Sequence, residues 1–208
     1  MKFININRLI VLSLTITLIF DAATTYAQSC MENISGSVLR LHILANSNSD
    51  ADQRLKLQVR DRLLQDATHL FENCTSSREA QRIAAENSQL LLKIAESEIR
   101  ARGFDYPVKM NIGEFSFPTR RYGSVWLPKG NYTALRVEIG EAMGKNWWCV
   151  MYPPLCFTND AVKISAASDE KLKASLGTEE YNLVTQADQG AVPVEIRFKI
   201  VEIFQGLF

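Results

Sequence analysis

Histidine is scarce in this sequence: among its 208 residues, only His42 and His69 are histidines. Both have ordinary structural explanations, since His42 lies in an apolar segment and His69 comes late in an expected helix, where the helix dipole favours it. The spacings of a Gly-x-Ser-x-Gly elbow, an HExxH zinc motif and a P-loop are all absent. We therefore predict no catalytic residues, no metal site and no cofactor, and by elimination we expect a protein that is not an enzyme.

The chain also lacks a surplus of charge of either sign. It has 23 basic and 23 acidic side chains, and loss of residues 1–27 would leave a net charge of about −1. Binding to nucleic acid depends on a clustered basic surplus that neutralises phosphates. Nucleic acid is therefore not expected as a partner. Beyond the N-terminal region, no hydrophobic run approaches the length that crosses a membrane.

The one long apolar run lies at the N-terminus, over residues 9–20. Lys2 and Arg8 form a short basic start before it, and small residues precede an expected cleavage site after Ala27. Residues 1–27 are therefore predicted to be a secretory signal peptide. An uncleaved membrane anchor is the alternative, although a run of twelve residues spans only ~18 Å as a helix, against a hydrocarbon core of ~30 Å.

The remainder of the chain suits one domain. About 180 residues remain after cleavage, which is enough for a substantial hydrophobic core. We predict a flexible N-terminal segment over residues 28–37 and a single globular domain over residues 38–208. Within that domain, residues 158–192 carry the weakest core pattern and are expected to be variable and weakly structured, with one or two short helices.

Export would change how the cysteines are interpreted, because paired cysteines outside the cytoplasm favour disulfides over metal or thiol chemistry. The four cysteines permit three pairings, and the sequence alone does not choose among them. We favour a bridge between Cys149 and Cys156, which would stabilise the fold by about 2.5 kcal/mol in the chain-entropy model. Cys30 and Cys74 could form a second bridge.

Hydrophobic periodicity predicts a strand followed by two helices. Residues 38–45 form a short, apolar, branched run that is typical of a buried strand. Apolar residues then recur at helical spacing over residues 50–72, after a capping residue at Ser49. A second helix begins with a capping box at Ser76 and ends near Gly103. Because the connection is short, the two helices should form an antiparallel hairpin.

Aromatic and branched residues become frequent in the second half of the chain. They predict strands over residues 107–117, 132–139 and 147–151. Residues 194–206 alternate like a strand, but their apolar spacing also suits a helix that begins at Pro193, and we predict a C-terminal helix. The expected fold is α+β: an N-terminal strand, an antiparallel helical hairpin, a mostly antiparallel β-sheet and the C-terminal helix.

The most unusual segment covers residues 146–157, with the sequence NWWCVMYPPLCF. Two of the three tryptophans of the chain, Trp147 and Trp148, are adjacent here. The segment is apolar and poor in charge, without a general base, an acid or a glycine-rich phosphate loop. Adjacent residues of a strand point to opposite faces, so one tryptophan should be buried while the other could face outward. We interpret this segment as one that holds a shape or contacts a partner.

Several blocks in one order resemble the stage II sporulation protein R family. They are LHILANSNSD followed by DQRLKLQVRD, then FPTRRYG, LPKGNY and NWWCVMYPPLCF, over residues 38–157. Proteins of this family are made in the forespore of endospore-forming bacteria and are secreted into the space between forespore and mother cell. There they activate a membrane-embedded aspartic protease of the mother cell, which processes pro-sigma-E. The resemblance thus implies a non-catalytic signalling protein whose partner is that protease.

The resemblance implies that the protein acts by binding its partner. Membrane contact is expected only through the partner or through an uncleaved signal peptide. Aromatic anchors on a stiff turn lose little entropy on binding, whereas the same residues could simply form core. Two polar or aromatic patches are therefore candidates for the receptor-binding surface. The first contains Trp147, Trp148, Tyr152, Pro153, Pro154 and Phe157, and the second contains Asn46, Asn48 and Asp50.

Helix capping alone is an alternative explanation for the Asn46–Asp50 patch. Arg120, Arg121 and Tyr122 form a third exposed cluster, which we interpret as a solvated turn. The alternative function is an extracytoplasmic hydrolase of cell-wall material. That activity would require two carboxylates such as Glu114 and Glu138, or a reduced cysteine beside a histidine, to converge in one cleft.

Overall fold

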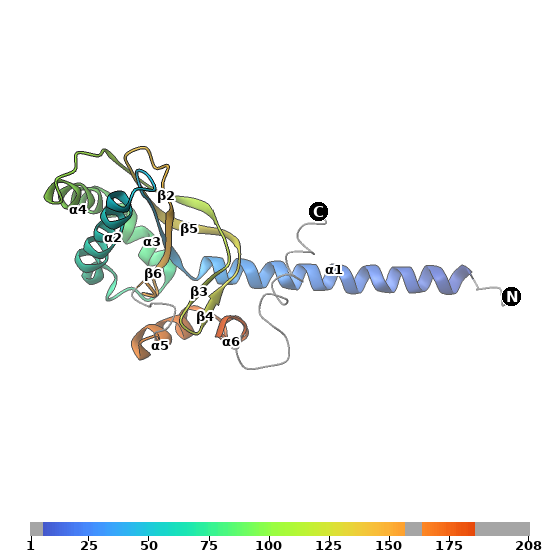
Figure 1. The fold of residues 1–208 in the computed structure, drawn as a ribbon. Coiled ribbons are helices and arrows are strands. Elements are labelled where there is room, and N and C mark those ends of the chain that lie inside the picture. The colour runs from blue at the N-terminus through green and yellow to red at the C-terminus, as the bar shows by residue number, and fades with distance from the viewer. Residues whose placement is uncertain (1–5, 157–163, 186–208) are drawn as a thin grey trace.

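A four-stranded sheet with helices packed against it forms the body of the protein, and one long helix extends from this body (Figure 1). The computed structural model describes residues 6–156 and 164–185. The helices are α1 (Ile6–Gly36), α2 (Asp50–Phe71), α3 (Ser77–Glu86), α4 (Ser88–Ala101), α5 (Ala166–Ser175) and α6 (Thr178–Thr185). The strands are β1 (Leu39–Leu44), β2 (Val108–Phe117), β3 (Arg120–Tyr122), β4 (Val125–Leu127), β5 (Gly130–Ile139) and β6 (Asn146–Tyr152). The predicted α+β class is confirmed.

The main sheet has the strand order β2-β5-β1-β6. Strands β2 and β5 pair antiparallel, as do β1 and β6, whereas β1 and β5 are parallel. The predicted mostly antiparallel sheet is therefore confirmed. Strand β1 lies between two neighbours and is buried along its whole length, which explains its nearly continuous apolar sequence. Strands β2 and β6 form the two edges of the sheet.

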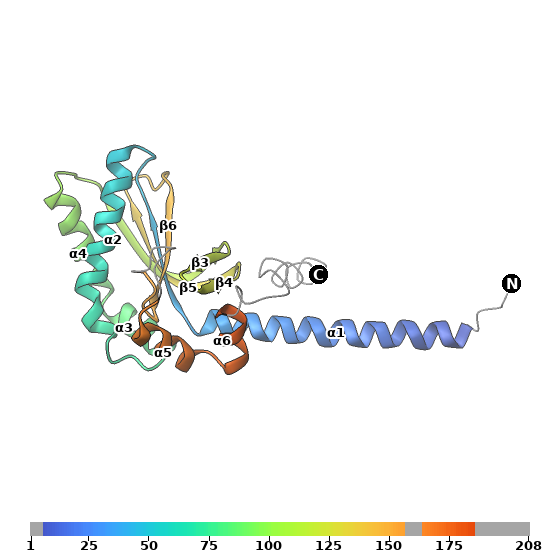
Figure 2. The ribbon, with the colours of Figure 1, turned by 60° about the horizontal axis from the view of Figure 1, so that its bottom comes forward.

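The predicted helical hairpin covers one face of this sheet. Figure 2 shows α2 and α4 side by side and running in opposite directions, with β3 and β4 on the other side of the sheet. The predicted second helix is in fact two helices, because the chain breaks at Asn87 between α3 and α4. There the side-chain Nδ2 of Asn87 donates to the carbonyl of Ile83 at 2.8 Å. An asparagine side chain that bonds its own backbone in this way competes with helix propagation.

The Ser49 hydroxyl caps α2 by accepting a hydrogen bond from the backbone N–H of Asp52 at 3.2 Å. Replacing Ser49 with alanine is expected to lower the free energy of unfolding by about 1 kcal/mol, because that N–H then loses its acceptor. Urea unfolding measures this difference. The matched control is Ser97→Ala, at an exposed position inside α4. Equal effects of the two substitutions would show that the cap contributes nothing.

The N-terminal helix is unbroken from Ile6 to Gly36, so the prediction of a flexible segment over residues 28–37 is wrong. The physical reason is burial: Cys30 and Ile34 lie in the core on the last turns of α1. The Ser77 hydroxyl also donates to the carbonyl of Gly36 and fixes the end of the helix to α3.

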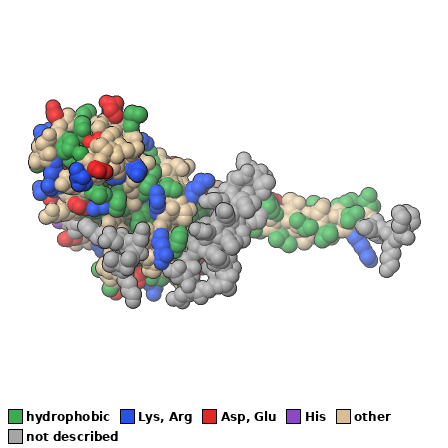
Figure 3. Space-filling view, in the orientation of Figure 1, with side chains coloured by type: hydrophobic (Ala, Val, Ile, Leu, Met, Phe, Trp, Pro, Cys, Tyr) green, Lys and Arg blue, Asp and Glu red, His purple; other side chains and the backbone are tan. Residues whose placement is uncertain are grey.

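The first part of α1 stands clear of the body, and Figure 3 shows hydrophobic side chains along it. Residues such as Leu12, Leu18 and Ile19 are more than half exposed. By length and composition α1 could cross a membrane, a property that a signal sequence near the N-terminus shares. The helix is thus compatible with the predicted signal peptide and with its alternative, an uncleaved anchor.

The weakly patterned region contains packed structure within the described residues. Helices α5 and α6 each bury an apolar side chain completely, Leu172 and Val184. The hydroxyl of Ser165 caps α5 by accepting a hydrogen bond from the backbone N–H of Ser168 at 3.1 Å. The predicted C-terminal helix lies outside the described residues.

Residues 120–122 are a strand rather than the solvated turn that we had predicted. Strand β3 pairs antiparallel with β4 to form a small two-stranded sheet, with Gly123 at positive φ in the turn. The aromatic side chain of Tyr122 is buried, whereas Arg120 and Arg121 are exposed. Strands of three residues carry too little alternation to be recognised in a sequence.

Candidate partner-binding site

A pocket of about 240 Å³ opens at the sheet edge formed by β6, where β3 approaches that strand. It brings together three segments that the sequence separates: the arginine-rich strand β3, the tryptophan pair and the two cysteines. Its lining residues are Arg120, Arg121, Tyr122, Asn146, Trp147, Trp148, Cys149, Leu155 and Cys156. We call this hollow the β6-edge pocket.

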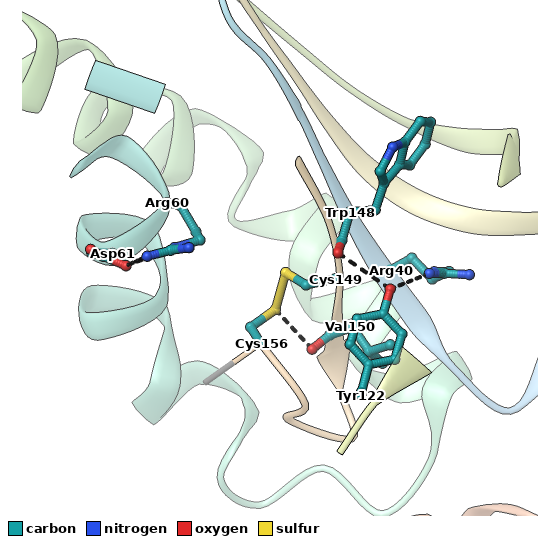
Figure 4. The surroundings of a disulfide bond; sticks show 8 residues. All are labelled: Arg40, Arg60, Asp61, Tyr122, Trp148, Cys149, Val150 and Cys156. Carbon is teal, nitrogen blue, oxygen red and sulfur yellow. Dashed lines mark hydrogen bonds and ion pairs between the residues drawn. A yellow bond between two sulfur atoms is a disulfide. The ribbon is translucent and has the colours of Figure 1, made fainter. Parts of the chain in front are cut away.

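The predicted disulfide forms one wall of the pocket. Cys149 and Cys156 are bonded, with their Cα atoms 5.0 Å apart, so this pairing is confirmed. The backbone N–H of Leu155 donates to the carbonyl of Val150 at 3.1 Å and closes the loop onto its own strand. The loop therefore has a fixed position beside β6 (Figure 4). Cys30 and Cys74 are both buried and free, so the suggested second bridge is not formed.

Tyr122 holds β3 against the edge of β6. Its hydroxyl donates to the carbonyl of Trp148 at 3.3 Å and accepts a hydrogen bond from the guanidinium of Arg40 (Figure 4). The carbonyls of Trp148 and Val150 thus both have partners within the protein. An edge strand usually offers such groups to an added strand. Here this edge is already partly occupied, so a partner would have to bind through the side chains.

Arg40 is the buried residue on which this arrangement depends. Its side chain is fully buried, and its guanidinium carbon lies 4.0 Å from the ring centroid of Phe117 and 4.7 Å from that of Tyr132. Aromatic faces stabilise a cation in this position. The only sign of this role in the sequence was that a basic residue stands in an otherwise apolar strand.

The tryptophans lie on opposite faces of β6, as strand geometry requires. The ring of Trp148 stacks on His42 with centroids 3.7 Å apart, and it meets Phe117 edge-on at 4.6 Å. On the helix side, the guanidinium of Arg60 lies 4.2 Å from the ring centroid of Trp147. Both side chains are half-buried, in place of the one buried and one outward residue that we had expected. Each tryptophan therefore keeps part of its surface available.

The remaining residues of the aromatic patch are less accessible than predicted. Tyr152 is buried and its hydroxyl donates to the carbonyl of Cys74 at 3.2 Å. Pro153 is buried, and Pro154 is half-buried and lines a different hollow. Tyr152 and Pro153 are thus part of the core, which corrects their assignment to the contact surface. Phe157 lies outside the described residues.

The polar patch fastens the turn between β5 and β6. Asn46 accepts a hydrogen bond from the backbone N–H of Glu141 at 3.0 Å, and Asn48 accepts one from that of Lys145 at 2.8 Å. Asp50 is exposed in the first turn of α2. Asn46 and Asn48 thus have a structural role in holding the β5–β6 turn, and not the helix capping that we had considered, which Ser49 provides. They also fix the chain that leads directly to Asn146 at the pocket.

His42 links the ring of Trp148 to Asn146, the first residue of β6. Its Nε2 lies 2.8 Å from Oδ1 of Asn146, and its buried Nδ1 has no hydrogen-bond partner among the described residues. Burial disfavours the charged imidazolium and lowers the pKa of His42 to about 4. At neutral pH the ring is therefore uncharged, and since an amide oxygen only accepts, Nε2 carries the proton.

The lowered pKa of His42 predicts that stability falls on acidification. Between about pH 6.5, the ordinary histidine value, and pH 4, the unfolded chain binds a proton that the folded protein excludes. The free energy of unfolding should therefore decrease through this window, by on the order of 2 kcal/mol. Urea unfolding at several pH values should show a smaller decrease for His42→Gln. His69→Gln, at an exposed position of α2, should keep the pH dependence of the wild type. If it reduced that dependence as much as His42→Gln does, the assignment to His42 would be wrong.

The geometry that a hydrolase would need is not present in these residues. Glu138 pairs with Lys109 and Glu114 pairs with Thr133, so the two carboxylates sit at different levels of the sheet. Glu138 is ion-paired with Arg136 at 2.8 Å, and Cys149 is oxidised in the disulfide. In the described ranges, no group of three or more histidine, cysteine, aspartate and glutamate side chains could hold a metal ion.

Comparisons with known proteins agree with the family resemblance of the sequence. The sequence profile of a family described as Stage II sporulation protein R matches residues 35–162. Stage II sporulation protein R of Bacillus subtilis (strain 168) is 34% identical over 191 residues, which cover 84% of this chain and 83% of that protein. No solved structure matches. The matched residues 35–162 include the whole main sheet and every residue that lines the β6-edge pocket.

Proposed function

The chain belongs to the stage II sporulation protein R family, and from this premise we propose that it is a secreted signal of sporulation. In this role it passes from the forespore into the space between forespore and mother cell. There it activates a membrane-embedded aspartic protease of the mother cell, and the activated protease processes pro-sigma-E. The protein itself performs no catalysis in this proposal.

The observation that carries the proposal is the β6-edge pocket. It lies within the segment that matches the family, and it presents two half-buried tryptophans on a strand that a disulfide and Tyr122 hold in place. Tryptophan and arginine are enriched among the residues that dominate binding energy. A rigid surface also loses little conformational entropy when it binds. Activation would follow if this surface binds the active state of the protease more tightly than the inactive state.

The exposed apolar part of α1 supports the proposed route. Its composition suits a signal sequence, and the turns that contain Cys30 and Ile34 come after the expected cleavage site at Ala27. Cleavage would therefore remove the exposed part and keep the buried part within the domain. Mass spectrometry of the exported protein should find Gln28 as its first residue.

A processing assay tests the function directly. Cells would express this protein, a matching membrane protease and the pro-sigma factor, with and without residues 1–27 of the first. We expect processing only when the protein is exported. If the precursor stays uncut beside a properly exported and folded protein, the proposed function is wrong. Processing by a chain that remains in the cytoplasm would instead refute the extracytoplasmic site of action.

A further inference from the structure

The expected cleavage site after Ala27 lies inside a regular helix, because α1 continues without a break to Gly36. Proteolysis favours accessible, locally extended chain, and a helical segment has to open before a peptidase can cut it. Extending the residues that follow Ala27 would draw Cys30 out of the core and disturb Ile34, which is fully buried. The folded body therefore opposes cleavage at this position.

Helix α6 contacts α1 on both sides of the cleavage site. It lies against α1 where that helix enters the body (Figure 2). The hydroxyl of Tyr26, the residue before Ala27, donates to Oε2 of Glu179 at 3.1 Å. Beyond the site, Nδ2 of Asn33 donates to Oε1 of Glu180 at 2.8 Å. Opening the helix around Ala27 would break the first of these bonds and loosen the second.

The part of α6 that makes these contacts is synthesised long after the cleavage site. About 150 residues separate Ala27 from Thr178, where α6 begins. At about 5–20 residues per second, their synthesis takes roughly 8 to 30 s. During that interval α6 cannot contact α1, so a peptidase has access to a site that the finished fold covers.

We infer that docking of α6 on α1 blocks the cleavage site, so that a chain that folds before it is cut keeps its N-terminal helix. The inference rests on the cleavage after Ala27 in the proposed function, and it adds the order of events. The cut is a hydrolysis by signal peptidase: one water is added across the Ala27–Gln28 bond, which leaves a carboxylate on Ala27 and an amino group on Gln28. The relative rates of cleavage and folding then set the ratio of released to anchored protein.

The carboxylates of α6 also have an ordinary explanation. Glu179 and Glu180 lie in the first turn of α6, where the helix dipole favours negative charge. That role requires no partner on α1, yet both carboxylates accept hydrogen bonds from it. Because these residues are far from Ala27 in sequence, substituting them leaves the sequence that the peptidase recognises unchanged.

Cleavage of the folded, full-length precursor tests the inference. The precursor is synthesised without a signal peptidase, folded in detergent micelles and mixed with purified signal peptidase, and mass spectrometry follows the fraction cut. Ile34→Ala removes a core contact of α1 and should increase the cleavage rate at least about tenfold over that of the wild type. Glu179→Ala combined with Glu180→Ala should increase it about threefold, because two hydrogen bonds to α1 are lost.

Two matched controls separate the contact from general effects. Glu170→Ala removes an exposed carboxylate from α5 and should leave the cleavage rate unchanged. Val59→Ala removes apolar atoms from an equally buried position of α2, and it should lower the urea midpoint without increasing the cleavage rate. If Val59→Ala accelerates cleavage as much as Ile34→Ala does, the rate reports global unfolding and the inference is overturned.

The remaining outcomes distinguish the inference from the proposed function. If the wild type is cut after Ala27 as fast as the double glutamate variant and Ile34→Ala, α6 does not block the site, and only the inference fails. If no form is cut after Ala27, the proposed cleavage is wrong and the inference fails with it. Pulse-chase labelling in cells gives the same answer in vivo: wild-type precursor left uncut when synthesis ends should persist, whereas that of the double variant should continue to disappear.

Discussion

Removal of the Trp148 side chain is expected to reduce the proposed activation of the protease strongly in a domain that still folds. The ring covers His42 and contacts Phe117, the side chain is only partly buried, and Trp148 lines the β6-edge pocket. A tryptophan at the centre of an interface typically contributes at least about 2 kcal/mol of binding energy. Processing by Trp148→Ala should therefore fall by about 30-fold or more when the variant and the wild type are compared at equal concentrations of folded protein.

The same substitution will also destabilise the domain, so stability has to be measured beside activity. We expect a loss of about 2 kcal/mol, less than the 3–5 kcal/mol of a fully buried tryptophan, because Trp148 is only half-buried. Phe104→Ala is the matched control: Phe104 is another partly buried aromatic residue, with its ring centroid 5.4 Å from that of Tyr106, and it is not among the residues that line the pocket. Comparable losses of activity in the two variants would mean that Trp148 acts through folding alone.

Removal of the disulfide is expected to have the second large effect. The double substitution Cys149→Ser and Cys156→Ser should lower the free energy of unfolding by about 2.5 kcal/mol, because the unfolded chain gains the freedom of the opened loop. The cysteine loop is also a wall of the pocket, so processing should decrease more than the change in folded fraction explains. Urea unfolding with and without a reducing agent measures the first effect, and the processing assay measures the second.

Free-thiol titration provides the control for the disulfide. The unfolded, non-reduced wild type should contain two reactive thiols, those of Cys30 and Cys74. A variant with alanine at both of these positions should show none, and it should respond to the reducing agent as the wild type does. If reduction leaves the stability of the wild type unchanged, the bridge does not contribute to the fold.

Regular elements with a long hydrophobic pattern were predictable from the sequence. The buried strand β1 and the capped helix α2 both appear within one or two residues of their expected limits. The second helix shows where such patterns fail: the apolar spacing continues through Asn87, yet the side chain of that residue bonds the backbone and ends α3. Apolar periodicity indicates which face of a helix is buried. It does not indicate where a side chain will form hydrogen bonds with the backbone and so end the helix.

The candidate site was only partly predictable. The tryptophan pair was recognisable because the residues are rare and adjacent, and the disulfide because its cysteines are close in sequence. The contribution of Arg120 and Arg121 depends on a three-residue strand and on the bond from Tyr122 to Trp148, which joins residues 26 positions apart. Tyr152 was assigned wrongly, because the sequence does not reveal that its hydroxyl reaches the carbonyl of Cys74.

Because α1 continues without a break into the folded body, it would fix the distance between that body and a membrane that held its apolar part. Its 31 residues measure about 46 Å, of which about 30 Å would lie within a bilayer if the helix stayed uncleaved. No joint separates the apolar part from the buried turns, so a retained copy would hold its domain close above the membrane that it came from, at one height and one orientation. Cleavage after Ala27 would remove this tether, and the domain could then diffuse to the opposite membrane.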